Sequence, residues 1–272
     1  MERAGLLFSR RQAIGGLGGL GLCVATAQHA AARSAFAWPG GAKAAVSLTY
    51  DDGLDSQLTN AAPALDAAGF KATFFLTEEN MQARVDDWVK VAQAGHEIGD
   101  HTVTHPCALS GFTAAGFEAQ ELTPMEQFLD AHFGPAGPRP YAYPCGFDQL
   151  GRGTRHERRA RYLGVLRKRF LAARTVAGPP NDPTEVKAER LELRAFEPTY
   201  DADDARRAFA YVDAAIASGG WAILVFHEIL PARAGEGDTS IATHKRILDG
   251  LRAAPVWCAP MGRVFNQVAA RT

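Results

Sequence analysis

The sequence predicts an α/β protein whose parallel strands are covered on both faces by helices. Short β-rich runs alternate with helical stretches from about residue 44 to the end of the 272-residue chain. Runs such as "WAILVF", residues 221–226, are apolar throughout, as expected of strands buried on both faces. No Ser- or Pro-rich linker separates two halves, so we expect one domain. The pattern leaves open whether the sheet closes into a barrel or stays an open doubly wound sheet.

The expected elements alternate in order along the chain. We expect strands at 44–50, 71–76, 96–99, 140–143, 170–175, 191–196, 221–226 and 256–258. We expect helices at 57–68, 84–94, 113–132, 156–168, 202–218, 240–253 and 261–270. Both candidate folds place ligand sites at the carboxyl ends of their strands, so polar residues there are the candidates for chemistry.

The first 37 residues predict an export signal. The segment "SRRQAIGGLGGLGLCVATA", residues 9–27, combines twin arginines with a weakly hydrophobic, Gly-rich run, which is typical of a twin-arginine signal. Its apolar part is shorter than the ~20 residues that a membrane-spanning helix needs. We therefore expect residues 38–272 to form a periplasmic or secreted domain, with no stable membrane insertion after signal removal.

The charge of the exported part argues against a polyanionic partner. Residues 38–272 carry 25 basic and 29 acidic side chains, a formal charge near −4. The segment 152–174 does carry nine Lys or Arg, but apolar residues are interleaved at helical spacing, so we interpret it as a solvated helix face. We expect no nucleic acid partner.

Polar residues gather where the expected strands end. Asp51 and Asp52 close the first strand, and His101 and His105 follow the third. If that segment makes one helical turn, the two imidazoles face the same way and can share a metal ion with one carboxylate. Adjacent aspartates also cap helices, and paired histidines also serve as polar packing, so neither motif decides alone. The turn "YAYPCG" and His227 follow two further strands, and the four features together predict one site.

The other histidines are expected to be structural or exposed. His96 begins the third strand, at the opposite end from the site, and we interpret it as structural. His132, His156 and His244 fall on expected helices, and we interpret them as surface groups.

With these motifs the sequence resembles the polysaccharide deacetylase family, the NodB-homology carbohydrate esterases. The stretches "GFKATFFL" and "AGHEIGDHTVTHP" also match the family in order and spacing, and the resemblance runs from about Trp38 to the C-terminus. It implies a distorted (β/α) barrel of about seven parallel strands in a single catalytic domain. The fourth motif has the YPxG form of the branch that includes poly-N-acetylglucosamine and chitooligosaccharide deacetylases. The family motifs stand here as "TYDDG" (49–53), "HTVTH" (101–105), "YAYPCG" (141–146) and "VFH" (225–227).

The resemblance assigns a metal site and a base. It implies that Asp52, His101 and His105 bind one divalent ion, most often zinc in this family, and that Asp51 is the general base. The chemistry agrees, because a dication lowers the pKa of a bound water toward ~7 and a nearby carboxylate can then take its proton.

The resemblance also assigns groups to the oxyanion, the substrate and the leaving amine. The backbone amide of Cys145 corresponds to the family's oxyanion donor, and Tyr143 in the same turn is placed among the oxyanion and substrate residues. His227 corresponds to the general acid that protonates the departing amine.

The sequence departs from the family pattern at several positions. An arginine that orients the base in many members is replaced by Ala142, and we expect Arg194, near the end of the sixth strand, to supply that charge. The D-x-x-D-W motif, which tunes the acid histidine, has no match, and Glu197 and Asp201 are candidates only by position. Val225 replaces the leucine of the last motif.

Three cysteines remain in the exported part, Cys107, Cys145 and Cys258. In the implied fold, Cys107 and Cys145 lie in loops at the same rim, and we hypothesise a disulfide between them. An odd number in an oxidising compartment leaves at least one thiol free or paired with another chain.

The predicted activity is that of an exported, metal-dependent carbohydrate N-deacetylase, a hydrolase of C–N bonds other than peptide bonds. It would remove N-acetyl groups from the amino sugars of a polysaccharide or oligosaccharide and release acetate. Two alternatives remain, a cyclic imide or ureide amidohydrolase on the same fold and a catalytically silent glycan-binding domain. The composition of the variable loops does not identify the glycan.

Overall fold

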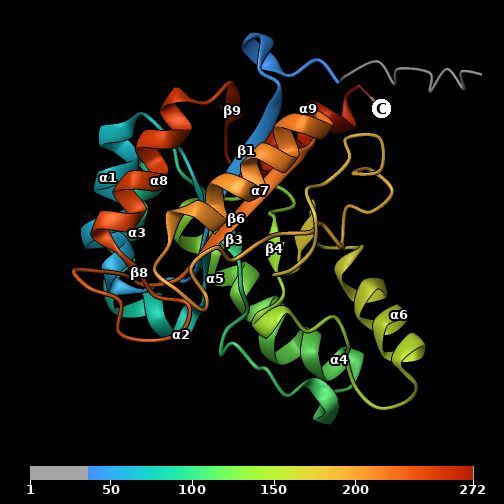
Figure 1. Ribbon diagram of the computed structural model, residues 1–272. Coiled ribbons are helices and arrows are strands. Elements are labelled where there is room, and N and C mark those ends of the chain that lie inside the picture. The colour runs from blue at the N-terminus through green and yellow to red at the C-terminus, as the bar shows by residue number, and fades with distance from the viewer. Residues whose placement is uncertain (1–35, 272) are drawn as a thin grey trace, which may run out of the picture. The chain divides into compact units, whose positions relative to one another are not determined.

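Seven parallel strands form the central sheet of the computed structural model, which describes residues 36–271 (Figure 1). The hydrogen-bonded order is β5-β4-β3-β2-β1-β6, and β9 also pairs with β1. A second, two-stranded sheet joins β7 and β8. The strands are β1 (Ala44–Asp52), β2 (Thr73–Leu76), β3 (Glu97–Asp100), β4 (Tyr141–Ala142), β5 (Ala173–Arg174), β6 (Trp221–Phe226), β7 (Ile229–Leu230), β8 (Thr239–Ser240) and β9 (Val256–Cys258).

Strand β1 is an inner strand of the sheet and has neighbours along both edges. β6 pairs with residues 45–50, β9 pairs with residues 44–46, and β2 pairs with residues 49–52. Because every neighbour is parallel, the carboxyl ends of the strands gather at one end of the sheet. The two aspartates at the end of β1 therefore lie among the strand ends that carry the other polar motifs.

An irregular segment closes the gap between β5 and β6. The sequence predicted a strand at 191–196, but the structure has only isolated bridges there, from Leu193 to Arg174 and from Phe196 to Leu224. The Leu193 amide donates to the Ala173 carbonyl at 2.9 Å, and the Phe196 amide donates to the Ile223 carbonyl at 2.9 Å. The segment passes from one neighbouring strand to the other within a few residues, so neither ladder grows into a regular strand. The result is the distorted barrel that the family resemblance implied.

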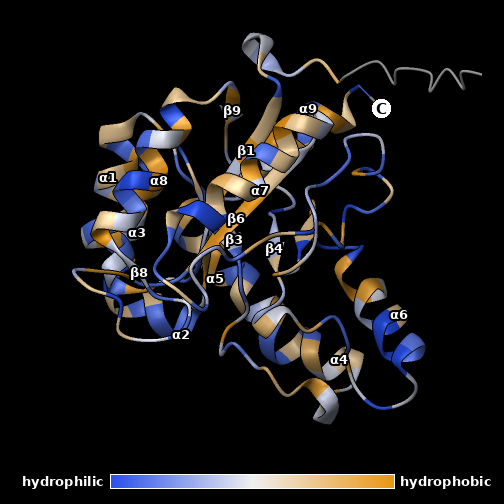
Figure 2. Ribbon diagram, in the orientation of Figure 1, coloured by the Kyte–Doolittle hydropathy of each residue, from blue (hydrophilic) through white to orange (hydrophobic). Residues whose placement is uncertain are grey.

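Helices surround the strands in the expected order. In Figure 1, α1, α3 and α8 lie together on one side, and α6 lies on the opposite side, with the strands between them. Figure 2 shows β6 as hydrophobic, whereas the end of α6 that is remote from the strands is hydrophilic. The helices are α1 (Ala62–Ala68), α2 (Glu78–Met81), α3 (Val85–Gln93), α4 (Ala114–Phe117), α5 (Thr123–Phe133), α6 (Arg155–Leu166), α7 (Ala205–Ser218), α8 (Ile241–Ala253) and α9 (Met261–Ala269), with π-helical turns at Gln57–Ala61 and Glu118–Leu122.

The side chains of β1 alternate between two apolar clusters. Val46, Leu48 and Tyr50 pack under the helices, whereas Ala45 belongs to the cluster that also holds Trp221 of β6. Successive side chains of a strand point to opposite faces, so a strand covered on both sides reads as a continuous apolar run. This packing explains why β1 and β6 were readable from the sequence.

The part of the basic segment that forms helix α6 lies at the surface, as predicted, whereas Arg174 at the end of the segment is fully buried on β5. Helix α6 begins with a capping box in which the Thr154 side chain accepts from the Glu157 amide and Glu157 reaches back to Thr154. Its buried residues are Tyr162, Val165 and Leu166. The apolar stripe holds the helix on the barrel and leaves its charged side chains partly or fully exposed.

One histidine differs from the expectation. His244 is buried rather than exposed, because the face of α8 that carries it packs on the sheet, where its Nε2 lies 2.7 Å from the Tyr50 hydroxyl. Burial lowers the pKa of His244 to about 4, so the ring is neutral near pH 7. His96 is buried and hydrogen-bonded, as expected for a structural residue.

The export signal expected over residues 1–37 falls almost wholly outside the described residues. Within residues 36–271, no helix has the length and apolar character that a membrane crossing requires.

Candidate metal and catalytic site

The two aspartates at the end of β1 reach one site through a change in the backbone. In a regular strand, Asp51 and Asp52 would point to opposite faces. Asp52 has a left-handed φ of 79°, and Gly53 follows with φ 74°. The Asp52 carbonyl accepts from the Thr77 hydroxyl and the Asn80 side-chain amide, both at 3.0 Å, which holds this unusual conformation. The turn brings the Asp52 carboxylate back beside Asp51.

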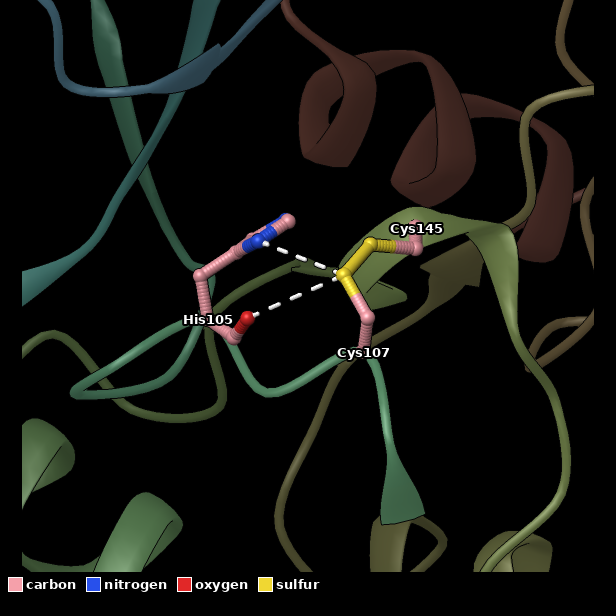
Figure 3. Close-up of side chains that lie close together, drawn as sticks. All are labelled: His105, Cys107 and Cys145. Atoms are coloured by element: carbon pink, nitrogen blue, oxygen red, sulfur yellow. Dashed lines mark hydrogen bonds between the residues drawn. A yellow bond between two sulfur atoms is a disulfide. The ribbon is translucent and has the colours of Figure 1, made fainter.

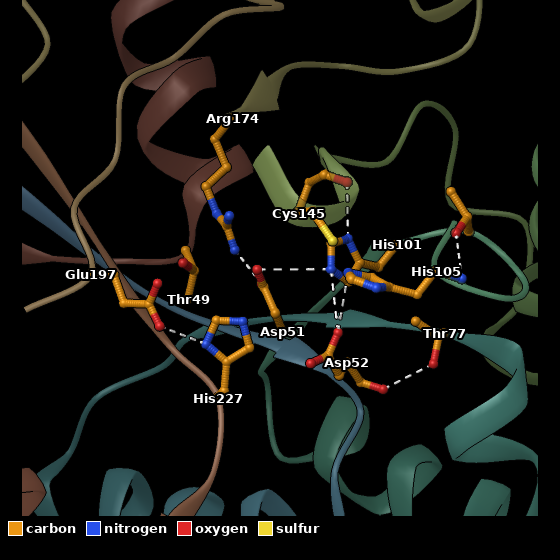
Figure 4. Close-up of polar contacts among 12 residues, drawn as sticks. Thr49, Asp51, Asp52, Thr77, His101, His105, Cys145, Arg174, Glu197 and His227 are labelled. Atoms are coloured by element: carbon orange, nitrogen blue, oxygen red, sulfur yellow. Dashed lines mark hydrogen bonds and ion pairs between the residues drawn. The ribbon is translucent and has the colours of Figure 1, made fainter. Parts of the chain in front are cut away.

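Three donor atoms converge beside Asp51 (Figure 4). Asp52 Oδ1 lies 3.5 Å from His101 Nε2 and 3.6 Å from His105 Nε2. His101 donates from Nδ1 to the Ala142 carbonyl at 2.9 Å, which fixes the ring and leaves Nε2 facing Asp52. Asp52 Oδ1 and His101 Nε2 are both buried without a hydrogen-bond partner.

The residues present fit a divalent metal ion. Buried polar atoms are normally paired, so two unpartnered atoms facing each other indicate a missing third group. The ligand atoms of a tetrahedral zinc ion lie about 3.4 Å apart, close to the spacing seen here. Burial raises the pKa of Asp52, but interactions with His101, His227 and His105 outweigh it and lower the pKa well below its usual range. Burial and the nearby His101 lower the pKa of His105, which favours the neutral, ligating imidazole.

The His101–His105 segment is a tight turn rather than the helical turn considered from the sequence. Thr102 and His105 have left-handed φ values of 72° and 53°. The Thr102 hydroxyl accepts from the His105 amide at 3.1 Å, and Glu121, buried in the following helical region, accepts from the Thr104 amide at 3.0 Å and hydroxyl at 2.8 Å. These bonds hold both imidazoles toward Asp52.

Asp51 is buried and paired with Arg174. Its side chain is 2% exposed, and its Oδ1 accepts from the Arg174 guanidinium, which is itself fully buried at the end of β5. Arg174 also lies over the Phe75 ring, 4.8 Å from its centroid. The Oδ2 atom of Asp51 faces His101 Nε2 at 3.8 Å. One oxygen of Asp51 is thus held by the arginine, and the other faces the donor cluster.

The arginine beside Asp51 is not the one expected from the sequence. Arg194 points away from this cluster and pairs with Glu189 at 3.2 Å and Glu185 at 3.7 Å. Arg174 stands directly opposite Ala142 in the β4–β5 ladder, and Ala142 is the residue that the resemblance aligned with an arginine of the family. An arginine ending the apolar run "FLAART" was the available signal, but its use required the register between the two strands.

His227 follows β6 and pairs with Glu197, with 2.9 Å between His227 Nδ1 and Glu197 Oε1. Burial lowers the pKa of His227, but contact with Glu197 and the charges of Asp51 and Asp52 outweigh it and raise the pKa to about 9. Of the two positional candidates for tuning this histidine, Glu197 therefore has the contact. Asp201 instead pairs with Arg207 at 3.0 Å.

The turn after β4 places Cys145 and Tyr143 at the same site. Cys145 has a left-handed φ of 53° and forms a disulfide with Cys107, which confirms that hypothesis, while Cys258 is free. Tyr143 is buried, and its hydroxyl donates to the Leu191 carbonyl at 2.8 Å. Tyr143 therefore presents its ring rather than a free hydroxyl.

A cavity of about 510 Å³ opens over these groups. Its wall includes Asp51, the two histidines of the donor cluster, Tyr143, Cys145 and His227. On the His227 side the wall continues through Phe196, Tyr200 and Arg207. Except for Arg194, the residues singled out from the sequence lie at this cavity or, in the case of Asp52, against its histidines.

The fold and the site together define a parallel (β/α)-barrel protein with a two-histidine, one-carboxylate donor set at its strand ends. The sequence profile of the polysaccharide deacetylase family matches residues 39–165. This match covers just under half of the 272-residue chain, and over that part the chain is similar to the polysaccharide deacetylase family.

Two curated relatives match part of the chain. A peptidoglycan-N-acetylglucosamine deacetylase from Bacillus cereus is 43% identical over 65 residues, which is 24% of this chain and 24% of the relative. A chitin deacetylase from Pestalotiopsis sp is 36% identical over 90 residues, which is 32% of this chain and 30% of the relative. The matched segments thus span about a quarter to a third of these relatives.

The similarity to solved structures extends over most of the described fold. A Mycobacterium smegmatis protein assigned to the polysaccharide deacetylases superposes with a TM-score of 0.62, covering 86% of this chain and 93% of that chain. At 19% identity, this likeness concerns the fold.

Proposed function

We propose that this protein is an exported, metal-dependent N-deacetylase that removes acetyl groups from the amino sugars of a glycan and releases acetate. The observation that carries the proposal is the convergence, in one cavity, of a buried paired carboxylate, a cluster of metal-donor atoms and a histidine whose pKa is raised. Amide hydrolysis needs these functions together, because water must lose a proton while the departing nitrogen gains one.

Asp51 takes the proton from the attacking water. Arg174 holds its Oδ1 and keeps it oriented, so Oδ2 is the oxygen that accepts the proton. A divalent ion held by Asp52, His101 and His105 would lower the pKa of a water and polarise the acetamide carbonyl. With one oxygen held, Asp51 meets the water in a single orientation.

His227 gives a proton to the departing nitrogen from Nε2, because Nδ1 is engaged by Glu197. A pKa raised to about 9 keeps the ring protonated near pH 7. As the carbon–nitrogen bond breaks, the sugar leaves as an amine and the acetyl group leaves as acetate. Without that proton the leaving group would be an unstable amide anion.

The backbone amide of Cys145 is assigned to the carbonyl oxygen, which gains negative charge as water attacks. The buried ring of Tyr143 is assigned to the apolar wall beside the acetyl group. Because the nitrogen must face His227, the sugar that carries it lies along the wall of Tyr200, Asp201 and Arg207. Tyr200 is 45% exposed, and such a ring offers an amphipathic surface to a pyranose.

We assign zinc to the donor set, because two imidazoles and one carboxylate with room for water is a set used by catalytic zinc. The YPxG form of the turn favours the branch of poly-N-acetylglucosamine and chitooligosaccharide deacetylases. Residues 1–37 are assigned to a twin-arginine signal and residues 38–272 to the mature periplasmic or secreted domain. A disulfide is typical of such an oxidising compartment.

Acetate release tests the proposal. Purified protein would be supplied with chitin oligomers, poly-N-acetylglucosamine, peptidoglycan and acetylxylan, before and after chelation and after zinc is restored. We expect release from an N-acetylated glycan that is lost on chelation and recovered with zinc. Full activity in metal-free protein would refute the metal role. Glycan binding without turnover would identify a silent binding domain, and hydrolysis of cyclic imides alone would identify the other alternative.

A further inference from the structure

The Cys107–Cys145 disulfide lies in contact with a candidate metal ligand (Figure 3). It joins two loops whose cysteines are 38 residues apart in sequence and 5.5 Å apart between Cα atoms. Cys107 Sγ lies 3.9 Å from His105 Nδ1 and 4.0 Å from the His105 carbonyl oxygen. The crosslink thus packs against the ring and backbone of His105.

The two histidines of the donor cluster are oriented by different means. His101 donates from Nδ1 to a backbone carbonyl and is 1% exposed, so hydrogen bonding and burial fix its ring. His105 is 30% exposed, and the neighbour of its Nδ1 is the Cys107 sulfur. A metal-bound histidine normally has a partner for its second nitrogen that orients the ring. At His105 the disulfide occupies the place of that partner.

The backbone conformation on both sides of the disulfide, at His105 and at Cys145, also has to be held by its surroundings. His105 and Cys145 both have a left-handed φ of 53°, which non-glycine residues adopt only where the surroundings hold them. On the amino side, the Thr102 hydroxyl and Glu121 anchor the turn. On the carboxyl side of His105, Cys107 is tied to the turn that carries Cys145.

We propose that the Cys107–Cys145 disulfide is a positioning device for the metal site: it fixes His105 against its partners and sets the distance from this ligand to the Cys145 turn. The first role concerns metal binding alone, and the second rests on the function proposed above. Both cysteines are exposed, so a solution reductant reaches the bond and provides an experimental handle.

Metal affinity is the direct test. Cys107→Ser, Cys145→Ser and the double variant would be titrated with zinc against a chromogenic chelator. We expect a loss of affinity of about 10- to 100-fold, the usual effect of removing an outer partner of a ligand. The double variant is the decisive one, because each single variant leaves beside His105 a thiol that can itself bind zinc. Unchanged affinity in the double variant would overturn the proposal.

Controls separate positioning from general stability. Cys258→Ser, which changes the free cysteine on β9, should keep wild-type affinity. Treating the wild type with a phosphine reductant and then capping both thiols should reproduce the loss, and the double variant should be insensitive to this treatment. Circular dichroism and thermal melts identify the temperature range in which every variant is folded. If the variants bind zinc as tightly as the wild type in that range, the disulfide only stabilises the fold and the proposal fails.

Kinetics on an active glycan test the second role. We expect a lower kcat at saturating zinc with little change in KM, because the substrate wall is untouched. An unchanged kcat would overturn this role. If the wild type binds zinc but releases no acetate, the proposed function fails while the affinity series still decides the role at His105. If acetate is released and the affinities are equal, that role fails alone.

Discussion

The two ends of the barrel treat buried polar groups in opposite ways. Among residues 36–271, the four non-glycine residues with a left-handed φ are Asp52, Thr102, His105 and Cys145, and all lie at the carboxyl ends of β1, β3 and β4 or in the segments that follow them. Two of the atoms that meet there, Asp52 Oδ1 and His101 Nε2, are buried without hydrogen-bond partners. The left-handed backbone positions and these two unpaired atoms therefore lie at the same end of the barrel.

At the amino end, two buried polar residues are hydrogen-bonded instead. His96 accepts from the Ala72 amide at 3.1 Å through Nδ1 and meets Asp66 at 3.2 Å through Nε2. The neighbouring Glu97 accepts from the Thr73 hydroxyl at 2.7 Å and the Gly262 amide at 2.9 Å. A buried histidine is thus not a functional signal in itself. The functional signal is a buried ring nitrogen that has no hydrogen-bond partner, and both ring nitrogens of His96 have partners.

The largest expected effect follows from Asp51→Asn, because the amide has no basic oxygen to accept a proton. We expect kcat to fall about 10²- to 10⁴-fold, the usual contribution of a general base. Zinc stoichiometry, measured by atomic absorption, should stay at the wild-type value. Loss of metal together with activity would mean that Asp51 is a ligand, and the division of roles between the two aspartates would be wrong.

Arg174→Met should cost about 3–5 kcal/mol in the free energy of unfolding, because it leaves Asp51 as an uncompensated buried charge. Denaturant titration measures this. The matched control is Arg194→Met, whose carboxylate partners are 51% and 40% exposed and whose loss should cost within about 1 kcal/mol. Equal costs in the two variants would contradict the assignment of Arg174 to Asp51.

A pair of histidine variants compares the two ends directly. His96→Gln should lower the free energy of unfolding by about 2 kcal/mol, because it disturbs buried hydrogen bonds, and should leave zinc stoichiometry unchanged. His101→Gln should abolish stoichiometric zinc binding. Thermal melts and metal analysis of both proteins provide the measurements. Zinc loss in the His96 variant would contradict the view that the histidine at the amino end is structural and that at the carboxyl end binds metal.

Glu197→Gln should give the smallest effect, a shift of the alkaline limb of kcat/KM to lower pH by about one unit. Glu197 raises the pKa of His227, and the acid acts only while protonated, so removing the carboxylate ends activity at lower pH. A pH–rate profile checks the shift. Asp201→Asn, which alters a surface ion pair, should leave the limb in place. A limb that does not move in the Glu197 variant would exclude His227 as the titrating acid.

Most of the fold could be predicted from the sequence because the apolar runs of the strands and the helical spacing of apolar residues are both clear. The strand at 221–226 and the strand at 256–258 are found at those residues, and the helices lie within a few residues of their expected bounds. The expected strand at 191–196 failed for a physical reason. Its apolar residues do belong beside β5 and β6, but they bridge the two strands in turn, and sequence pattern records burial better than pairing.

The site was predictable where its residues lie in local motifs. The two aspartates and the histidine pair are each contained within a few residues, and the structure brings them together. Arg174 was missed because its position opposite Ala142 depends on the register between β4 and β5. That register cannot be predicted from the sequence of either strand alone. His244 was misjudged because the inward face of α8 includes a polar residue that pairs with Tyr50.

The register that sets Arg174 opposite Ala142 has a wider consequence. Opposite residues of adjacent parallel strands point to the same face. The arginine can therefore lie on either strand, provided that the opposite residue on the other strand has a small side chain. Members of the family that differ here would therefore exchange two residues at once rather than lose one. A motif that is incomplete when followed along the chain can be complete when followed across the sheet.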